Sequence, residues 1–316
     1  MANAEFNLSE LVEKMPPTDR ELEAIKAAAA TEGTSAGPKP KADKAPASKF
    51  TAPDPEVAED ICRQILQQGR RAIEGLIELI RDPASPAFVN YKPEYLCHCL
   101  TVFLGHPTRT GQRRAYVDIL AAQAGRAQHS LHTRLFLIRE LQWIGDTSCV
   151  AALAPMLLDE RLCDAAACAL LAIRDGVEEA FRKALATATG RCRLVNLQSL
   201  AVLSDRASAR AFEQALEDAD ADVRMAAGWG LARLPHPPAA AILLRKADAA
   251  ANWERIKLTQ SCLLMAERLV DIGRKAEART IYTHLRDTRQ DPGEKHVREA
   301  ARKALELMGT GLAVNR

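Results

Sequence analysis

The chain has 316 residues, of which 47% are hydrophobic but only 4% aromatic. Ala and Leu dominate, and this composition favours helices, because strands prefer β-branched and aromatic residues. A net charge of +2 and a pI near 8.1 argue against a dedicated nucleic-acid binder, which usually carries a concentrated basic face. Neither a secretory signal nor the roughly eighteen apolar residues of a membrane span is evident, so we expect no membrane partner.

The first 53 residues divide into a helical tail and a linker. Residues 7–12 and 18–30 have the pattern of two short helices, the second preceded by two prolines. Residues 32–53 are rich in Ala, Pro, Lys, Ser and Gly, so they cannot bury enough apolar surface to offset their ordering entropy. We therefore predict a disordered linker over 32–53. Residues 1–31 are either a docking motif or, as we expect, a mobile appendage.

A repeat begins after this linker. Four segments align without gaps at spacings of 29, 30 and 31 residues, and a fifth fits the same pattern. The five segments are Thr133–Ile144, Leu162–Ile173, Cys192–Leu203, Val223–Leu234 and Val297–Met308. All have Leu at the ninth position, and apolar or small residues recur at helical spacing. Each segment is therefore predicted to be an amphipathic helix with one wide buried face.

Shorter helices are predicted between these segments, separated by Gly, Asp and Pro breakers. They span Cys149–Leu158, Val177–Ala186, Ala207–Leu216 and Ala239–Lys246. One helix pair cannot cover its own apolar face, whereas stacked pairs bury each other's faces. The sequence thus predicts an all-α fold, an α-solenoid of stacked antiparallel helix pairs.

The repeat helix resembles that of HEAT repeats, in the short variety of about thirty residues found in phycobilisome lyases. The pattern V-R-x-x-A-x-x-x-L-x-x-L carries the resemblance, at Val223–Leu234 and, with Met at the last position, at Val297–Met308. The resemblance implies a HEAT-like superhelix over residues 54–309. Residues 129–248 match it well and 54–126 only loosely, as two degenerate pairs: Pro55–Leu66 with Arg71–Ile80, and Pro93–Leu104 with Gly111–Ala124.

The C-terminal part of the array departs from the period. Residues 251–309 are predicted to hold a unit that resembles a tetratricopeptide hairpin, starting with a long helix over Ile256–Ile272, and then the final repeat. Residues 310–316 form a tail. The architecture remains a solenoid of helix pairs with this unit included.

We find no constellation that predicts catalysis, a metal or a cofactor. In a helix, Cys97 and Cys99 would point about 200° apart, so the Cys-His-Cys cluster cannot hold one tetrahedral ion. His129 and His132 lack further ligands nearby, and no nucleotide-binding or nucleophile motif occurs. Seven of the eight cysteines fall in apolar helical patterns, as expected of buried free thiols in a reducing compartment, so we expect a cytoplasmic protein.

One column of the repeat is basic. The second position is occupied by Arg134, Arg193, Arg224 and Arg298 in four of the five segments. These arginines form either a ladder that braces neighbouring repeats or a contact surface for an anionic partner. We favour bracing, with loop acids such as Asp220 or Asp222 as partners of Arg224.

A second set of positions should face the concave side of the array, where solenoids bind partners. Positions three, seven and ten of the repeat helices supply the candidate partner-binding residues Leu135, Arg139, Gln142, Leu194, Gln198, Met225 and Trp229. Leu194, Met225 and Trp229 break the expectation of a polar face, and such apolar patches mark binding surfaces. In the alternative interpretation the buried face is rotated by one position and Trp229 belongs to the core.

The sequence favours a non-catalytic scaffold that binds a protein or peptide partner on the concave face. Two alternatives remain open. A nucleic-acid-binding helical-repeat protein would need basic side chains in the groove, which the candidate residues do not supply. A phycobilisome-lyase-like enzyme or chromophore-binding protein would reveal itself by its absorption spectrum. Nucleic acid and small-molecule substrates are not expected.

Overall fold

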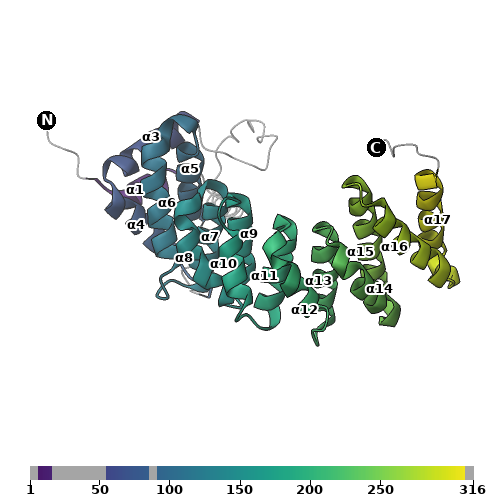
Figure 1. Cartoon of the computed structure of the whole chain (residues 1–316). Helices are drawn as coiled ribbons and strands as arrows, with labels where there is room; N and C mark the ends of the chain where they lie inside the picture. The colour runs from purple at the N-terminus through teal and green to yellow at the C-terminus, as the bar shows by residue number, and fades with distance from the viewer. Residues whose placement is uncertain (1–5, 16–54, 85–90, 310–316) are drawn as a thin grey trace, which may run out of the picture. The chain divides into compact units, whose positions relative to one another are not determined.

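The computed structural model describes residues 6–15, 55–84 and 91–309. The second predicted N-terminal helix, the linker over 32–53 and the tail over 310–316 lie outside these residues. The chain divides into two compact units, residues 1–153 and 154–316, which we describe separately (Figure 1). Within the described ranges every regular element is a helix, so the predicted all-α class is confirmed.

Unit 1 consists of stacked helix pairs with one additional helix at its N-terminus. Its α-helices are α1 (Leu8–Glu13), α3 (Pro55–Gln67), α4 (Arg70–Glu78), α5 (Tyr91–Leu104), α6 (Thr110–Ala124), α7 (Leu131–Ile144) and α8 (Val150–Leu153). Helices α3, α5 and α7 pack side by side in one row, and α4 packs on α6 in the other. The core between the rows includes Leu76, Leu100, Tyr116 and Leu120, all 0% exposed. Helices α3 with α4 and α5 with α6 lie where the sequence predicts two degenerate pairs.

Part of the N-terminal tail, for which the sequence predicts mobility, is a packed helix. Asn7 caps α1, because its side chain accepts hydrogen bonds from the backbone N–H groups of Ser9 and Glu10. Helix α1 contacts α4 and α5, and Leu11 and Val12 are buried there. These contacts lie within unit 1 and tie residues 6–15 to α4 of its first helix pair and α5 of its second.

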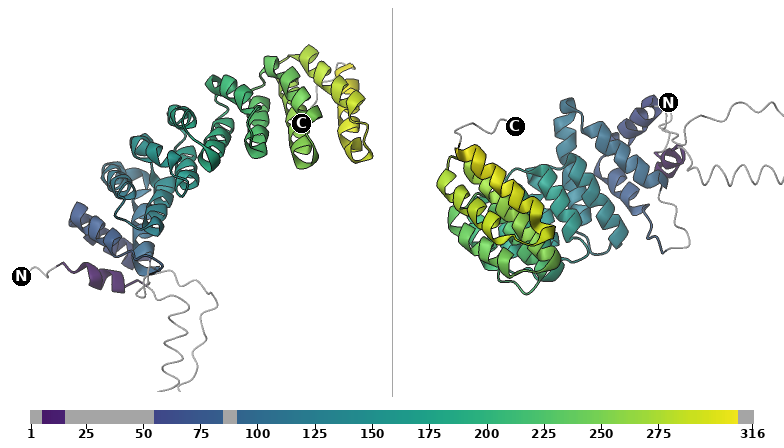
Figure 2. Two further views of the ribbon diagram at one scale, coloured as in Figure 1. Left: turned by 90° about the horizontal axis from the view of Figure 1, so that it is seen from below. Right: turned by 90° about the vertical axis from the view of Figure 1, so that its right-hand side faces the viewer.

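Unit 2 continues the alternation of helices. It contains α9 (Cys163–Ile173), α10 (Glu178–Leu185), α11 (Gly190–Leu203), α12 (Ala209–Ala215), α13 (Ala221–Arg233), α14 (Ala240–Ala249), α15 (Asn252–Asp271), α16 (Lys275–Thr288) and α17 (Lys295–Gly309). Helices α9, α11, α13 and α15 pack successively in one row, and each of α11, α13 and α15 also contacts a helix of the second row. Figure 2 shows this arrangement from two further directions.

The predicted repeat helices correspond to α7, α9, α11, α13 and α17. Their shared leucine is fully buried in the first four, at Leu141, Leu170, Leu200 and Leu231. Leu305 of α17, the last described helix, is only partly buried. The period therefore identified the buried face correctly, and the last repeat differs because α16 is its principal packing partner among the described helices.

Two predicted helices have different bounds in the structure. The segment predicted as one helix over Cys149–Leu158 is α-helical only over Val150–Leu153 and continues as a 3-10 helix over Ala154–Leu158. Pro155 accounts for this break, because it has no N–H to donate and its ring clashes with the preceding turn. The long helix predicted over Ile256–Ile272 begins earlier, at Asn252, so Trp253 lies in its first turn.

No helix in the described parts of the chain is both long and apolar enough to cross a membrane. All eight cysteines are free thiols, and six of them are buried. Cys99 is partly exposed and Cys168 is exposed, so the prediction of uniformly buried cysteines is wrong for these two.

Candidate binding pocket

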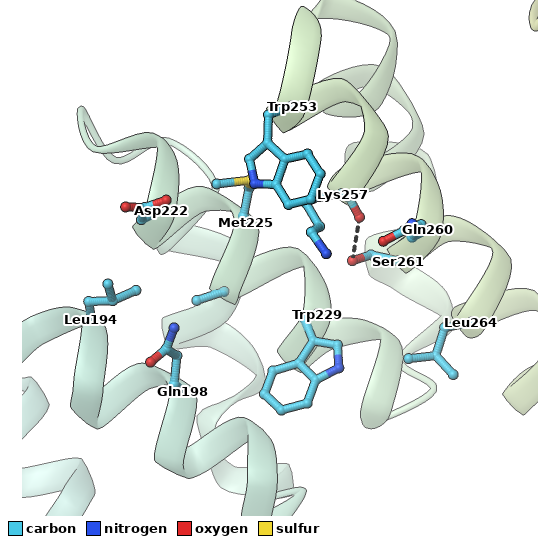
Figure 3. A pocket seen from close by; sticks show the side chains of 11 residues that line it. Leu194, Gln198, Asp222, Met225, Trp229, Trp253, Lys257, Gln260, Ser261 and Leu264 are labelled. Carbon is cyan, nitrogen blue, oxygen red and sulfur yellow. Dashed lines mark hydrogen bonds between the residues drawn. The ribbon is translucent and has the colours of Figure 1, made fainter. Parts of the chain in front are cut away.

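Three neighbouring helices of unit 2 surround an open pocket of about 700 Å³ (Figure 3). We call it the tryptophan pocket, and its lining residues are Leu194 and Gln198 of α11, Asp222, Met225, Ala226 and Trp229 of α13, and Trp253, Lys257, Gln260, Ser261 and Leu264 of α15. In Figure 3, Leu194 and Gln198 lie on one side of the pocket, and Gln260 and Leu264 lie on the other. The lining therefore comes from one continuous row of packed helices.

Four of the sequence-predicted partner-binding residues meet in the tryptophan pocket. Leu194, Gln198, Met225 and Trp229 all line it. Trp229 is partly exposed, so its indole is neither fully solvated nor enclosed in the core. This position differs from both sequence interpretations, which placed Trp229 either on an open face or in the core.

The other three predicted residues lie on α7 in unit 1 and do not line this pocket. Leu135 is partly exposed, whereas Arg139 and Gln142 are exposed. Each is therefore accessible within its own unit. The structure does not bring these residues together with the tryptophan pocket.

Helix α15 supplies about half of the pocket lining, and the sequence pattern did not identify these residues. Trp253, Lys257, Gln260 and Leu264 recur at spacings of four, three and four residues, which places them on one helix face. This regular spacing was a usable signal. It was missed because the helix was expected to begin three residues after Trp253.

Two glycines of α13 explain how closely α12 and α15 approach this helix beside Trp229. A Cβ at Gly228 would lie 2.7 Å from Leu258 of α15, closer than side chains tolerate. A Cβ at Gly230 would overlap the ring of Phe212 on α12. The small residues on either side of Trp229 thus let α12 and α15 pack directly against the α13 backbone.

Cationic side chains of the protein lie against both indole rings. The Arg233 guanidinium is 5.1 Å from the centre of the Trp229 ring, and Lys257 Nζ is 4.5 Å from that of Trp253. Arg233 also donates to the Ala201 and Val202 carbonyls of α11 at 2.7 and 3.1 Å. These contacts restrain the two rings, because cation–π attraction favours one face-on arrangement.

The charge of the pocket lining is nearly balanced. Lys257 and Asp222 are its only charged members, and among the described residues neither forms an ion pair. The nearby Glu254 is engaged by Arg224, whose Nε and Nη2 donate to its two carboxylate oxygens at 2.5 and 2.7 Å. This hydrogen-bonded pairing lowers the pKa of Glu254, which therefore stays ionised.

The arginines of the predicted column bind groups at or just after the ends of neighbouring helices, each within its own unit. The hydrogen bonds run from Arg134 to the Ala124 carbonyl (2.9 Å), from Arg193 to the Asp218 carboxylate (2.8 Å), from Arg224 to the Asp218 carbonyl (2.7 Å) and from Arg298 to the Arg289 carbonyl (2.8 Å). Arg224 therefore contacts Asp218 and Glu254 rather than the expected side chains of Asp220 or Asp222. All four guanidinium groups have partners within their own unit.

A fifth arginine joins this set although the repeat pattern did not include it. Arg255 Nε and Nη2 contact the Glu294 carboxylate at 2.7 and 2.9 Å, and Nη1 donates to the Asp248 carbonyl at 3.1 Å. It repeats the arrangement of Arg224 one helix pair later. Arg255 follows Arg224 by 31 residues, at the repeat spacing, but the ninth position of that segment is Cys262 instead of leucine, which hid this correspondence in the sequence.

The Cys-His-Cys segment of α5 serves packing in unit 1. Cys97 is buried, and His98 Nδ1 lies 3.1 Å from the buried Glu140 carboxylate of α7. Burial raises the pKa of Cys99 to about 11, so its thiol is protonated at neutral pH. Across the described residues, no group of three or more His, Cys, Asp or Glu side chains is placed to hold a metal ion.

Comparison with known proteins gives no family assignment. No family model matches the chain, and a search of the curated proteins finds no match. One similar solved structure is an engineered protein, 16% identical over 96% of this chain and 84% of that chain, with a TM-score of 0.42. Another is the complex of CpcE and CpcF of phycocyanin lyase from Nostoc sp. PCC7120, 17% identical over 84% of this chain and all of that chain, with a TM-score of 0.39.

Proposed function

We propose that this protein is a non-catalytic scaffold of the HEAT-like kind and that the tryptophan pocket binds a peptide segment of a partner protein. The observation that carries the proposal is the meeting of partly exposed Trp229 and exposed Trp253 with Met225 and Leu194 around one open space. Trp253 is 59% exposed, which leaves a large apolar ring in contact with water. A ligand that covers these side chains gains the free energy of their removal from water.

The chemistry of the lining favours a protein ligand. Tryptophan and methionine are enriched at protein interfaces, and binding energy usually concentrates on a few such residues surrounded by polar ones. Gln198 and Gln260 supply amide groups at opposite sides of the pocket that can hydrogen-bond a peptide backbone. A nucleic-acid ligand would require several cations in the lining, where Lys257 stands alone.

Preorganisation supports the same proposal. Because Arg233 and Lys257 already lie against the two indoles, a ligand need not immobilise free rings on binding. The glycines beside Trp229 fix its backbone between α12 and α15. The expected ligand is a segment with a bulky apolar side chain that inserts between the tryptophans.

The test is affinity purification from native extracts with the full chain as bait. We expect a partner that the wild-type protein captures to be lost with Trp229→Ala/Leu194→Ser and with Trp253→Ala. The matched control is Trp143→Ala, which removes a tryptophan that is 70% exposed but lies in unit 1. Circular dichroism should be unchanged in all variants. Retained capture by both pocket variants would contradict the proposal.

The same purified protein tests the two alternatives. Retention on DNA that falls steeply with salt concentration would favour the nucleic-acid alternative, since released counterions produce that dependence. Absorption at visible wavelengths would favour a chromophore-binding or lyase-like protein. We expect neither, and we expect the bait to behave as a cytoplasmic protein in fractionated cells.

A further inference from the structure

Helix α1 occupies a defined site formed by α4 and α5 of unit 1. Leu11 and Val12 of α1 are 5% and 6% exposed, and Met15, two residues after the end of the helix, is 2% exposed. A Cβ at Gly75 of α4 would lie 3.3 Å from Leu8 Cδ2, so the absence of a side chain at Gly75 leaves room for Leu8. Figure 1 shows α1 beside α4, although residues 16–54 separate α1 from α3 in the sequence. The surfaces of α4 and α5 thus form a receptor for an amphipathic helix, which we call the α1 site.

The α1 site also recognises charge. Lys92 of α5 reaches the end of α1, where its Nζ lies 2.6 Å from Glu13 Oε2 and donates to the Glu13 carbonyl at 3.4 Å. The Lys92 side chain is only 17% exposed, whereas that of Glu13 is 73% exposed. The lysine therefore belongs to the receptor surface, and the acid approaches it from the solvent side.

These contacts define the ligand that the site accepts. It is a helix with apolar residues at the spacing of Leu8, Leu11, Val12 and Met15, and with an acid one residue after the third of them. This is the usual pattern of a helix that lies in an apolar groove, with anchors at i, i+3, i+4 and i+7. Specificity for the acid comes from Lys92.

Helix α1 itself is a weak occupant. It has six residues, far fewer than the roughly twelve to fifteen at which isolated helices become even marginally stable in water. A cavity of about 200 Å³, lined by Ser9, Val12, Leu79 and Pro93 among others, remains open beside it. A longer helix with the same apolar spacing could fill that space and would start from a more stable helical state.

We propose that the α1 site is a second protein-binding site, whose ligand is an amphipathic helix of a partner protein with this spacing and acid, and that α1 occupies it as a displaceable internal ligand. Its attachment through residues 16–54 gives α1 a high local concentration and makes it a competitor of any external helix. The site lies in unit 1, so the proposal is independent of the tryptophan pocket in unit 2.

The test uses the full chain and a fluorescent synthetic peptide of residues 4–17 as the stand-in for the partner helix. In Leu11→Ser/Val12→Ser the internal helix loses two buried apolar contacts and leaves the site. We expect this variant to bind the peptide at least about tenfold more tightly than the wild-type protein, where α1 competes. Equal affinities, or no binding to the variant at millimolar peptide, would overturn the proposal.

A charge reversal locates the bound peptide. Adding Lys92→Glu to the double variant should lower its affinity for the peptide, and a peptide with Glu13→Lys should recover it. The matched control, Lys303→Glu on the exposed surface of α17, should have no effect. Binding that is insensitive to Lys92→Glu would place the peptide elsewhere. A loss of helical circular dichroism in Leu11→Ser/Val12→Ser that exceeds the six residues of α1 would show that α1 is an essential part of the core of unit 1. Insensitivity of binding to Lys92→Glu and such a loss of helix would each overturn the proposal.

Discussion

Gly230→Ala tests how closely α12 and α13 pack beside Trp229. A Cβ at Gly230 would overlap the Phe212 ring, with the ring atoms Cε1, Cδ1 and Cζ as its nearest neighbours. Phe212 is 0% exposed, so its ring has no free space on the solvent side into which it can rotate. The variant therefore requires α12 or α13 to move, or the ring to leave its preferred rotamer.

Two opposing effects set the magnitude. Replacing glycine by alanine inside a helix gains about 1 kcal/mol of helix propensity. Overpacking a closed core typically costs about 1–3 kcal/mol, and an aromatic ring held on all sides belongs at the upper part of that range. We therefore expect a net loss of about 1–2 kcal/mol in the free energy of unfolding. Gly309→Ala is the control within unit 2, since Gly309 of α17 is exposed with nothing within 4 Å of an added Cβ, and it should be neutral or stabilising.

The assay is urea unfolding followed by tryptophan fluorescence. Of the three tryptophans only Trp143 lies in unit 1, so a Trp143→Phe background makes fluorescence report unit 2 alone. This matters because two units can unfold in separate transitions. Phe212→Leu should relieve the overlap, with a favourable coupling to Gly230→Ala of at least about 1 kcal/mol. A Gly230→Ala protein as stable as its parent would refute the packing argument.

Three further predictions concern the Arg224–Glu254 pair, the His98–Glu140 contact and the free thiols. Arg224→Met and Glu254→Gln should show a coupling of about 1 kcal/mol or more in a double-mutant cycle. Because Arg224 lowers the pKa of Glu254, the coupling should be present above pH 4.5 and vanish as the pH falls through the lowered pKa. The hydrogen bond to Glu140 raises the pKa of His98. The stability lost in His98→Gln should therefore be greatest below pH 6.5 and shrink as the pH rises through the raised pKa. A loss of stability that does not depend on pH would contradict this prediction. Among the thiols, exposed Cys168 should react first with a thiol reagent and the six buried ones only after unfolding, which a time course with and without urea measures.

The sequence was most informative where one helix repeats a fixed pattern. Leu141, Leu170, Leu200 and Leu231 recur at the same position of successive helices, and all four are fully buried. A buried leucine stripe at helical spacing depends on local geometry alone, so it can be identified without knowledge of neighbouring helices. The same reasoning brought Leu194, Met225 and Trp229 to one face, because residues at equivalent positions of stacked helices become neighbours.

Contacts between repeats could not be derived in this way. Arg224 binds Glu254, which is 30 residues away and lies in a unit that departs from the period. The sequence offered nearer acids at Asp220 and Asp222, and nothing local distinguishes them from the true partner. The position of α1 was equally inaccessible, since six residues have too little helix propensity to imply order, and their burial depends on a surface formed more than fifty residues later.

The tryptophan pocket illustrates why a binding face can be harder to predict than the core beneath it. Its walls come from α11 and α13, which carry the shared leucine of the repeat, and from α15, which has Cys262 at that position. A buried position of the repeat helix requires only a small or apolar residue, so many sequences satisfy it. The tryptophan pocket requires in addition that Trp229 and Trp253, on two helices of different length, lie close together. Gly228 makes this possible, because Leu258 of α15 packs where a side chain would otherwise stand. The exposed surface is thus set by a packing detail at the centre of the helix row, and substitutions at Gly228 should alter binding without contacting the ligand.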